Sequence, residues 1–413
     1  MGYISIFNIL LSKPVVQSLQ VLKKGMVIIM KVLILSCIMG EGHNTAANAV
    51  SEFLQTQNIE CEILDTLTLA GKNASEKANN AYLMSTRLPL VFRFTYFAGK
   101  MISSPKRKSP VYYKNRSYRN QLFDYIQQNG FDTIITTHLF PAEALTALKR
   151  ENRLTASTIG ILTDYTCSPF WVETELDYYI IPHKDLTNEF IKKGIQEAKI
   201  LPYGIPVKQS FYQKLPKEDA RNEINQRYDL TFDISKPFYM IMSGSMGFGK
   251  IGLLVNAIVQ VQKEAVNIII VCGNNRKLKK HLSMLFNHSK NVAVLGFVKE
   301  VSLLMDGCDV IFTKPGGLSS TEAAIKNIPI IHTAPIPGCE IDNAAFFSDH
   351  GMSYRSNRII RQLHNAKMLC CDPAYREYMV ESQKENMSYH SCELIYETLC
   401  SLDEAKRMPA KHA

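Results

Sequence analysis

Short apolar runs with strand character alternate with helix-like segments along most of the chain. This alternation is typical of a mostly parallel sheet covered by helices. It weakens between residues 202 and 233, where proline and charged residues replace the pattern, and it resumes after residue 237. The expected strands are residues 31–37, 133–136, 158–162 and 178–181 before this break and 238–242, 267–272, 292–295, 310–312 and 328–332 after it. The sequence therefore predicts an α/β protein with two doubly wound units.

The length of 413 residues fits two domains, each large enough to bury its own core. We expect an N-terminal extension over residues 1–29, a first domain over 30–203, a linker over 204–236 and a second domain over 237–375. Residues 376–413 form a C-terminal helical segment that can pack back on the first domain. The most apolar run, residues 26–39, is interrupted by Lys31 and is shorter than the roughly 20 residues of a membrane-spanning helix.

The ten cysteines contain no CxxC pair and no repeated spacing, so neither a zinc site nor a disulfide framework is predicted. The same usage fits a reducing cytosol. We therefore expect a cytoplasmic protein that has no structural metal.

The net charge of +9 is concentrated in residues 77–123, which contain ten basic residues and no acidic ones. Aromatic and aliphatic residues lie between the basic ones, and this combination is an interfacial signature. A solvated charged loop and a nucleic-acid patch are the alternatives, and no nucleic-acid partner is expected because the aromatic residues do not form alternating base-stacking modules. The basic residues are Lys77, Arg87, Arg93, Lys100, Lys106, Arg107, Lys108, Lys114, Arg116 and Arg119.

In the first half, the sequence Gly40-Glu41-Gly42-His43 follows the first expected strand and opens a helix. Glycines let a substrate approach the backbone closely, and a helix N-terminus favours electron-rich oxygen. His43 is therefore a candidate general base, while a capping or packing histidine is the alternative. The turn departs from the dinucleotide fingerprint GxGxxG because position 45 is threonine.

Two other expected strands of the first half end in Thr137-His138 and in Thr163-Asp164. Carboxyl ends of parallel strands meet at one edge of a sheet, so these side chains can approach His43. Asp164 is a second candidate base or a group that orients the acceptor. Alternatively, His138 and Asp164 only cap neighbouring turns.

The second half opens with a glycine-rich loop over residues 243–250, directly after a strand and before a helix. The loop nearly matches the phosphate-binding motif GxxxxGK, but Ile251 replaces the serine or threonine that holds magnesium. A magnesium-dependent NTPase is disfavoured, although such a backbone can still bind a diphosphate. The candidate binding residues of this loop are Gly244, Ser245 and Gly247.

A second glycine turn, Pro315-Gly316-Gly317-Leu318, also lies between a strand and a helix. Its backbone donors suit a diphosphate, and Glu322 one turn later can accept hydrogen bonds from both ribose hydroxyls of a nucleotide. Alternatively, Ser319 and Glu322 form a capping box. Farther along, Glu340 and Asn343 present an acid and an amide that suit sugar hydroxyls.

Taken together, these motifs resemble those of one family. The motifs are GxGH, Thr-His-x-x-Pro, Ser-Gly-x-x-Gly-x-Gly, Gly-Phe-Val, Lys-Pro-Gly-Gly-Leu and Pro-Gly-x-Glu-x-x-Asn, in this order between residues 30 and 351. The sequence resembles the monogalactosyldiacylglycerol synthases and processive diacylglycerol glucosyltransferases of glycosyltransferase family 28. This resemblance implies a GT-B fold with two Rossmann-like domains facing across a cleft, inversion at the anomeric carbon and no catalytic metal.

The resemblance also implies roles for individual residues. Phe297 and Val298 should frame the uracil, Glu322 should bind the ribose, and His43 should be the base. The diphosphate should face Gly316, Gly317 and Leu318, and the donor sugar should be held by Glu340 and Asn343. The family usually has glutamine where Cys339 stands, so glucose, galactose and GlcNAc all remain open as the donor sugar.

The function implied is an inverting transfer of a hexose from a UDP-sugar to diacylglycerol or a glycosyl-diacylglycerol. It also implies that residues 77–123 dock on an anionic membrane, at the cytoplasmic face of the cell membrane. Two other functions stay open, namely a UDP-sugar epimerase of the same fold and a non-catalytic nucleotide-sugar sensor.

Overall fold

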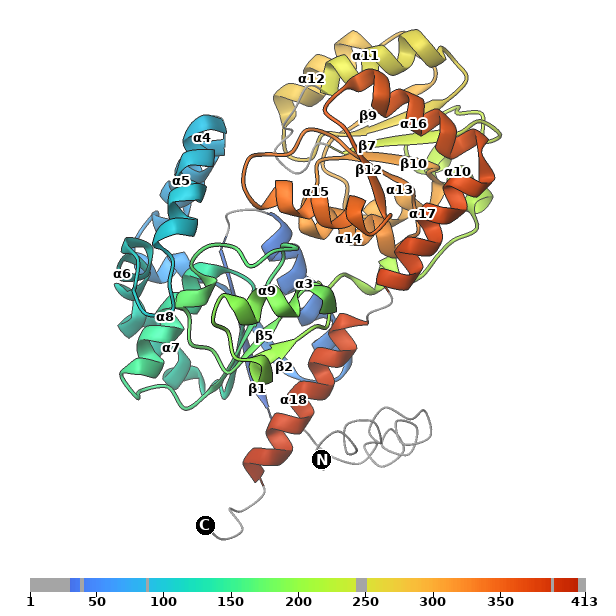
Figure 1. Cartoon of the computed structure of the whole chain (residues 1–413). Helices are drawn as coiled ribbons and strands as arrows, with labels where there is room; N and C mark the ends of the chain where they lie inside the picture. Colours follow the sequence, from blue (N-terminus) through green and yellow to red (C-terminus); the bar gives the residue numbers. More distant parts are fainter. Residues whose placement is uncertain (1–29, 38–40, 87–88, 243–250, 388–389, 408–413) are drawn as a thin grey trace.

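The computed structural model describes residues 30–37, 41–86, 89–242, 251–387 and 390–407. Two α/β units lie one above the other, and each is built on its own sheet (Figure 1). The β-branched and other apolar runs of the sequence form the central strands, because strands covered by helices on both faces are buried throughout. Loop 243–250, with Gly244, Ser245 and Gly247, lies outside the described residues.

The first sheet has six parallel strands in the order β2-β1-β3-β4-β5-β6. All four strands predicted for the first half are present, and β2 and β6 are additional. Their bounds are β1 Lys31–Ser36, β2 Glu60–Asp65, β3 Thr133–Thr136, β4 Ser157–Ile161, β5 Tyr178–Ile180 and β6 Ile200–Leu201.

The second sheet has six parallel strands in the order β12-β11-β10-β7-β8-β9. All five strands predicted for the second half are present, and β12 is additional. Their bounds are β7 Phe238–Met242, β8 Asn267–Val271, β9 Val292–Leu295, β10 Val310–Thr313, β11 Ile330–His332 and β12 Ser353–Arg355. The prediction of two doubly wound α/β domains is therefore confirmed.

Helices connect the strands and cover both sheets. Those of the first unit are α3 Glu41–Thr56, α4 Ala74–Thr86, α5 Pro89–Ile102, α6 Pro110–Arg116, α7 Arg119–Asn129, α8 Leu139–Arg150 and α9 Thr187–Lys192. Those that follow are α10 Lys217–Arg227, α11 Ile251–Gln262, α12 Arg276–Leu285, α13 Val301–Gly307, α14 Gly317–Ile325, α15 Cys339–Asp349, α16 Ile359–Cys371, α17 Pro373–Asn386 and α18 Ser391–Arg407. No helix in these described ranges is long and apolar enough to cross a membrane.

The segment expected to be a linker contains helix α10, which packs on α13 of the second unit. Ala220 and Ile224 are buried there, and Arg221 donates hydrogen bonds to the Gly307 carbonyl and to Asp309. Residues 217–227 thus belong to the second unit. The connection between the units is the shorter stretch before α10.

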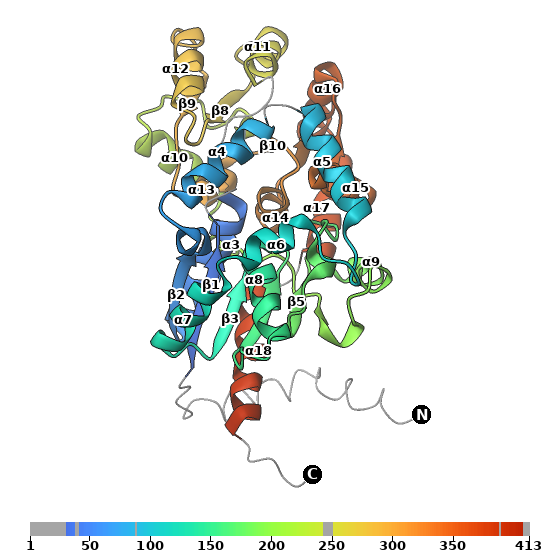
Figure 2. The ribbon, with the colours of Figure 1, turned by 90° about the vertical axis from the view of Figure 1, so that its left-hand side faces the viewer.

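The last two helices belong to different units. Met379 of α17 is buried in the core of the second unit. Ile395 and Leu399 of α18 are buried against Val32 and Ile34 of the first sheet. Helix α18 therefore runs beside the first unit, away from the second (Figure 1). On the other side, α4 and α5 rise from the first unit to the level of the second (Figures 1 and 2).

Candidate active site

A cleft of about 450 Å³ lies between the two units, at the carboxyl ends of their central strands. The first unit and the connection contribute Glu41, Gly42, His43, Thr45, Asn48, Thr163, Asp164, Lys208 and Phe211 to its lining. The second unit contributes residues that include Phe297, Val298, Lys299, Lys314, Gly316, Gly317, Leu318, Ser319, Glu322, Cys339 and Glu340. The structure therefore brings together nine of the predicted site residues: His43, Asp164, Phe297, Val298, Gly316, Gly317, Leu318, Glu322 and Glu340.

His43 lies in the first turn of α3, and its hydrogen bonds fix the tautomer of the neutral ring. Its Nδ1 is 2.7 Å from the carbonyl oxygen of Thr137, which can only accept a hydrogen bond. Nδ1 therefore carries the proton, and the Thr163 hydroxyl lies 3.0 Å from the same nitrogen. The lone pair is left on Nε2, which has no hydrogen-bond partner among the described residues. A neutral histidine in this tautomer is ready to accept a proton.

Two opposing effects act on the pKa of His43. Burial lowers this pKa because the charged imidazolium is poorly solvated, and the nearby Asp164 carboxylate raises it. Burial is the larger effect, so the net direction is downward. His43 is therefore neutral at pH 7, which is the state that a general base needs.

His138 is a capping residue. Its Nδ1 accepts a hydrogen bond of 3.1 Å from the backbone N–H of Phe140 at the start of α8. Burial lowers its pKa well below the ordinary value, and it does not line the cleft. The capping interpretation is thus confirmed for His138, whereas Asp164 lines the cleft.

The glycine turn of the second unit forms the start of α14, whose N-cap is Gly316. No side chain of the described residues caps this helix, so the alternative in which Ser319 and Glu322 form a capping box is wrong. Because the helix begins at Gly317, Glu322 lies too far along it to bond the N-cap backbone. The free N–H groups of the first turn border the cleft, as an anion site requires.

Glu322 is buried on α14, and its carboxyl group has no hydrogen-bond partner among the described residues. Burial raises the pKa of its carboxyl group to about 8, and the positive charge of Lys208 opposes this effect. A carboxylate without partners in a cleft is suited to accept two hydroxyl hydrogen bonds from a ligand.

Glu340 lies in the first turn of α15 and already has partners. One oxygen is 2.6 Å from Nζ of Lys314, and the other accepts a hydrogen bond of 2.8 Å from the N–H of Ile336. Asn343, which was expected beside the donor sugar, is completely buried and does not line the cleft. Its amide instead bonds Asp164, Tyr165 and Pro315.

Three lysines that were not predicted as site residues also line the cleft: Lys208, Lys299 and Lys314. A lysine next to a glycine turn, such as Lys314, is a signal that sequence reasoning could have used. Lys208 gave no such signal, because it lies in the segment taken as a linker. Lys208 pairs with Glu52 and Lys314 pairs with Glu340. All three ammonium groups still add positive potential at the cleft, which suits a diphosphate.

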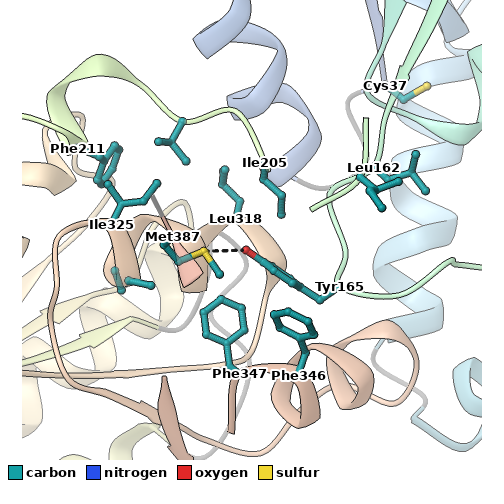
Figure 3. Packing of buried hydrophobic residues seen from close by; sticks show 14 of the residues in the cluster. Cys37, Leu162, Tyr165, Ile205, Phe211, Leu318, Ile325, Phe346, Phe347 and Met387 are labelled. Atoms are coloured by element: carbon teal, nitrogen blue, oxygen red, sulfur yellow. Dashed lines mark hydrogen bonds between the residues drawn. The ribbon is translucent and has the colours of Figure 1, made fainter. Parts of the chain in front are cut away.

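Tyr165 of the first unit packs among side chains of the second (Figure 3). Its ring packs against Phe346 and Phe347 of α15, with ring centroids 4.7 and 4.8 Å away. Its hydroxyl lies 2.7 Å from the Thr321 hydroxyl and donates to the sulfur of Met387. The first unit thus inserts an aromatic side chain into the core of the second.

A family model for monogalactosyldiacylglycerol (MGDG) synthase matches residues 43–207, and the glycosyltransferase family 28 C-terminal domain matches residues 238–391. The chain belongs to the MGDG synthase group of glycosyltransferase family 28. It is 29% identical over 372 residues to the processive diacylglycerol beta-glucosyltransferase of Bacillus pumilus, covering 89% of this chain and 94% of that protein. The enzyme of the same name from Bacillus subtilis is 28% identical, with coverage of 92% and 97%.

Solved structures agree with this family in fold. MurG of Acinetobacter baumannii superposes with a TM-score of 0.57 at 15% identity, covering 90% of this chain and 99% of that chain. The UDP-GlcNAc 2-epimerase of Neisseria meningitidis superposes with a TM-score of 0.58 at 14% identity, covering 90% and 100%. The GT-B fold is thus confirmed. At these identities the likeness concerns the fold alone, and the family models identify this member as a glycosyltransferase.

Proposed function

We propose that this glycosyltransferase moves a hexose from a UDP-sugar to diacylglycerol, or to a glycosyl-diacylglycerol, with inversion at the anomeric carbon. The names of its relatives support the lipid acceptor. One observation carries the proposal: a histidine with an unprotonated Nε2 faces, across one cleft, a buried carboxylate and the start of a helix. The histidine suits an alcohol acceptor, and the carboxylate and the helix start suit a nucleoside diphosphate.

In this mechanism His43 Nε2 takes the proton of the acceptor hydroxyl as the oxygen attacks the anomeric carbon. The attack comes from the face opposite the leaving UDP, so the configuration inverts. The negative charge that develops on UDP meets the first-turn N–H groups of α14 and the lysines of the cleft, Lys208, Lys299 and Lys314. These groups allow the chain to stabilise the leaving group without a metal.

The donor would be bound by the second unit. Phe297, two-thirds exposed at the rim, and the buried Val298 would frame the uracil, and the carboxylate of Glu322 would accept both ribose hydroxyls. Gly316, Gly317 and Leu318 would face the diphosphate. Glu340, held by Lys314, would contact the sugar.

We also propose that the protein docks on the inner face of the cell membrane through helix α5 and the loop after it. Phe94, Phe97 and Met101 are 73%, 61% and 74% exposed, and their spacing places them on one face of the helix. Burying such side chains in a bilayer is favourable. We define the α5 surface as Arg93, Phe94, Phe97, Met101, Ile102, Lys106 and Arg107, all exposed.

The α5 surface is smaller than the predicted contact over residues 77–123. Lys108 is nearly buried and pairs with Glu175, while Arg116 and Arg119 both pair with Glu151. Charges that are neutralised within the fold attract anionic lipid only weakly. We therefore assign the attraction to anionic lipid to the basic residues of the α5 surface that remain exposed.

The decisive experiment incubates the purified protein with radiolabelled UDP-glucose, UDP-galactose or UDP-GlcNAc, each with and without diacylglycerol in phosphatidylglycerol vesicles. Label in the lipid fraction that depends on diacylglycerol is the expected result, and the most active donor identifies the sugar. Interconversion of UDP-sugars without lipid would instead identify an epimerase. Donor binding without turnover under any condition would identify a sensor.

A further inference from the structure

Asp164 belongs to the first unit, but residues of the second unit hold it in place. Nδ2 of Asn343 donates a hydrogen bond of 2.9 Å to Asp164 Oδ1. The Cys339 thiol also hydrogen-bonds to this carboxylate. Cys339 and Asn343 are four residues apart and therefore lie on the same face of α15. One face of a donor-domain helix thus contacts one carboxylate of the acceptor domain.

The hydrogen-bonding groups of Asn343 are occupied inside the protein. Its Oδ1 accepts a hydrogen bond of 2.6 Å from the N–H of Tyr165, and its Nδ2 also reaches the Pro315 carbonyl at 3.1 Å. The residue has no exposed surface. To bind a sugar hydroxyl, Asn343 would have to give up these contacts and leave a buried N–H unsatisfied, which is costly.

The position of Asp164 matters for the basicity of His43. The carboxylate raises the pKa of this histidine against the larger effect of burial. An electrostatic effect of this kind depends on distance, so a rotation of the carboxylate would change it. The neighbouring Thr163 fixes the ring through its hydroxyl. His43, the Asp164 carboxylate that raises its pKa and the Thr163 hydroxyl that contacts its ring therefore act together.

We infer that Asn343 is a positioning residue that, from the donor domain, holds the Asp164 carboxylate beside His43. This inference rests on the proposed role of His43 as the base. The base then has its full strength only when the two domains are closed on each other, because the amide that orients Asp164 comes from the opposite domain. Donor binding and proton removal are coupled through α15, which also carries Glu340.

Within the part of the chain that the structure describes, three other titratable groups face Asp164. These are His43 on α3, Cys339 on α15 and Tyr96 on α5. Burial raises the pKa of the Cys339 thiol and of the Tyr96 hydroxyl well above their ordinary values, so both stay neutral between pH 6 and 8. Among the described residues that face Asp164, His43 is the group whose charge changes nearest this range. The Glu322 carboxyl group of the same cleft, with a pKa of about 8, also titrates there. Each pH profile is therefore interpreted as the difference between Asn343→Asp and the wild type, in which Glu322 is the same.

The test replaces Asn343→Asp, which keeps the shape and the acceptor for the N–H of Tyr165 but removes the donor to Asp164. When ionised, the introduced carboxyl group would repel Asp164, and when protonated it would donate a hydrogen bond in place of the amide. We expect kcat at pH 8 to fall by about 10-fold or more and to recover as the pH is lowered towards 6. The KM for the UDP-sugar should stay within about threefold of the wild-type value.

The exposed Ile341→Ala on the same helix is the matched control and should keep the wild-type pH profile. The exchange Asp164→Asn with Asn343→Asp restores one donor and one acceptor, so it covers the case in which the single variant does not fold. The exchange variant should melt near the wild-type temperature. Its kcat should stay low, since the carboxylate then belongs to α15 and position 164 next to His43 holds a neutral amide.

Two results would overturn the inference. The first is a wild-type pH profile for Asn343→Asp together with a raised KM for the UDP-sugar, which would make Asn343 a sugar ligand. The second is full turnover by the exchange variant, which would make the contact merely structural. If the wild-type protein does not glycosylate lipid, that result contradicts the proposed function itself, before any variant is compared.

Discussion

The carbonyl oxygen of Thr163 lies only 1.9 Å from the position that a Cβ atom on Gly317 would occupy. Thr163 follows β4 of the first unit, and Gly317 is the first residue of α14 in the second. The two domains therefore touch backbone to backbone at the cleft. Only glycine permits this approach, because any side chain would overlap the opposite carbonyl.

Gly317→Ala should hold the domains apart without unfolding either of them. Since the overlap involves backbone, the side chain cannot turn away, and the closed arrangement is lost. We expect turnover to fall by about 100-fold, because misplacing reacting groups by about 1 Å has an effect of this size. Small-angle scattering should show a more open molecule. Gly252→Ala in α11 is the control, because its Cβ would make an ordinary contact of 3.6 Å with Leu282.

Unchanged scattering and turnover in Gly317→Ala would mean that the closed arrangement is not the active one. The same result would weaken the proposed coupling through α15. Loss of turnover in the Gly252→Ala control would point to a general sensitivity of the second unit, and the effect at Gly317 would then have no specific meaning.

The sheets could be predicted because their central strands are short, buried apolar runs with clear ends. The strands that the sequence did not reveal lie at sheet edges. β2 spans Glu60–Asp65, with acidic residues and no buried position, and β6 and β12 have only two and three residues. An edge strand is specified by its neighbour more than by its own pattern, so its sequence carries little signal.

The site was predictable where one short motif supplies a whole feature, such as the turn around Gly316. It was not predictable where a side chain is shared between domains. Asn343 bonds Asp164, which is 179 positions away in the chain, and nothing in the local spacing distinguishes this contact from a sugar ligand. Lys208 reaches the cleft only because the connection between the domains passes beside it.

Glu322→Gln tests the ribose contact and has a characteristic pH dependence. Burial raises the carboxyl pKa to about 8, so the ionised form destabilises the fold. The free energy of unfolding of the wild type should therefore fall as the pH rises from the ordinary value of about 4.5 to 8. The Gln variant lacks this loss, and its advantage in melting temperature should grow over that range.

The same substitution should weaken UDP binding by about tenfold or more, because a neutral amide accepts hydrogen bonds less strongly than a carboxylate. Wild-type binding at pH 7 should release protons, since the ribose hydroxyls favour the ionised carboxyl group. Titration calorimetry in buffers of different ionisation enthalpy measures this release. The exposed Glu377→Gln is the control, and equal UDP affinity in both variants would exclude Glu322 as a ribose ligand.

Lys106→Glu with Arg107→Glu should weaken binding to phosphatidylglycerol vesicles by at least roughly 30-fold, since each lost basic residue contributed about 1 kcal/mol and the new carboxylates repel the anionic surface. The loss should be larger at low salt than at high salt. Lys108 is left unchanged in this test, because it pairs with Glu175 and donates to the Glu173 carbonyl. Its reversal would disturb the fold instead of the surface.

Phe94→Ser with Phe97→Ser should also reduce vesicle binding, and this loss should persist at high salt because apolar burial is not screened. Met284→Ser with Leu285→Ser on α12 is the matched control, since these side chains are also more than half exposed but lie in the second unit. Sedimentation with the vesicles measures both pairs. If the α12 variant loses binding and the α5 variant does not, the membrane contact lies on the other domain.

His43→Ala tests the general base, and its expected effect follows from the hydrogen bonds of the ring. Thr137 holds the proton on Nδ1, so the lone pair of Nε2 is the part of the side chain that the reaction needs. Turnover should fall by at least about 10²-fold, while UDP-sugar affinity stays near normal because the donor is held by the other domain. His43→Gln is a useful companion, since its amide keeps polarity at the same place without basicity.

Asp164→Asn tests whether His43 or Asp164 is the general base. If Asp164 only supports His43, removing its negative charge lowers the pKa of His43, and the acidic limb of the pH profile moves to lower pH. Turnover at pH 8 then falls by about 10-fold, as expected for Asn343→Asp, because His43 is still neutral there but has become a weaker base. If instead His43→Ala keeps most of its turnover and Asp164→Asn loses it at every pH, Asp164 takes the proton. His43 would then be a residue that orients the acceptor.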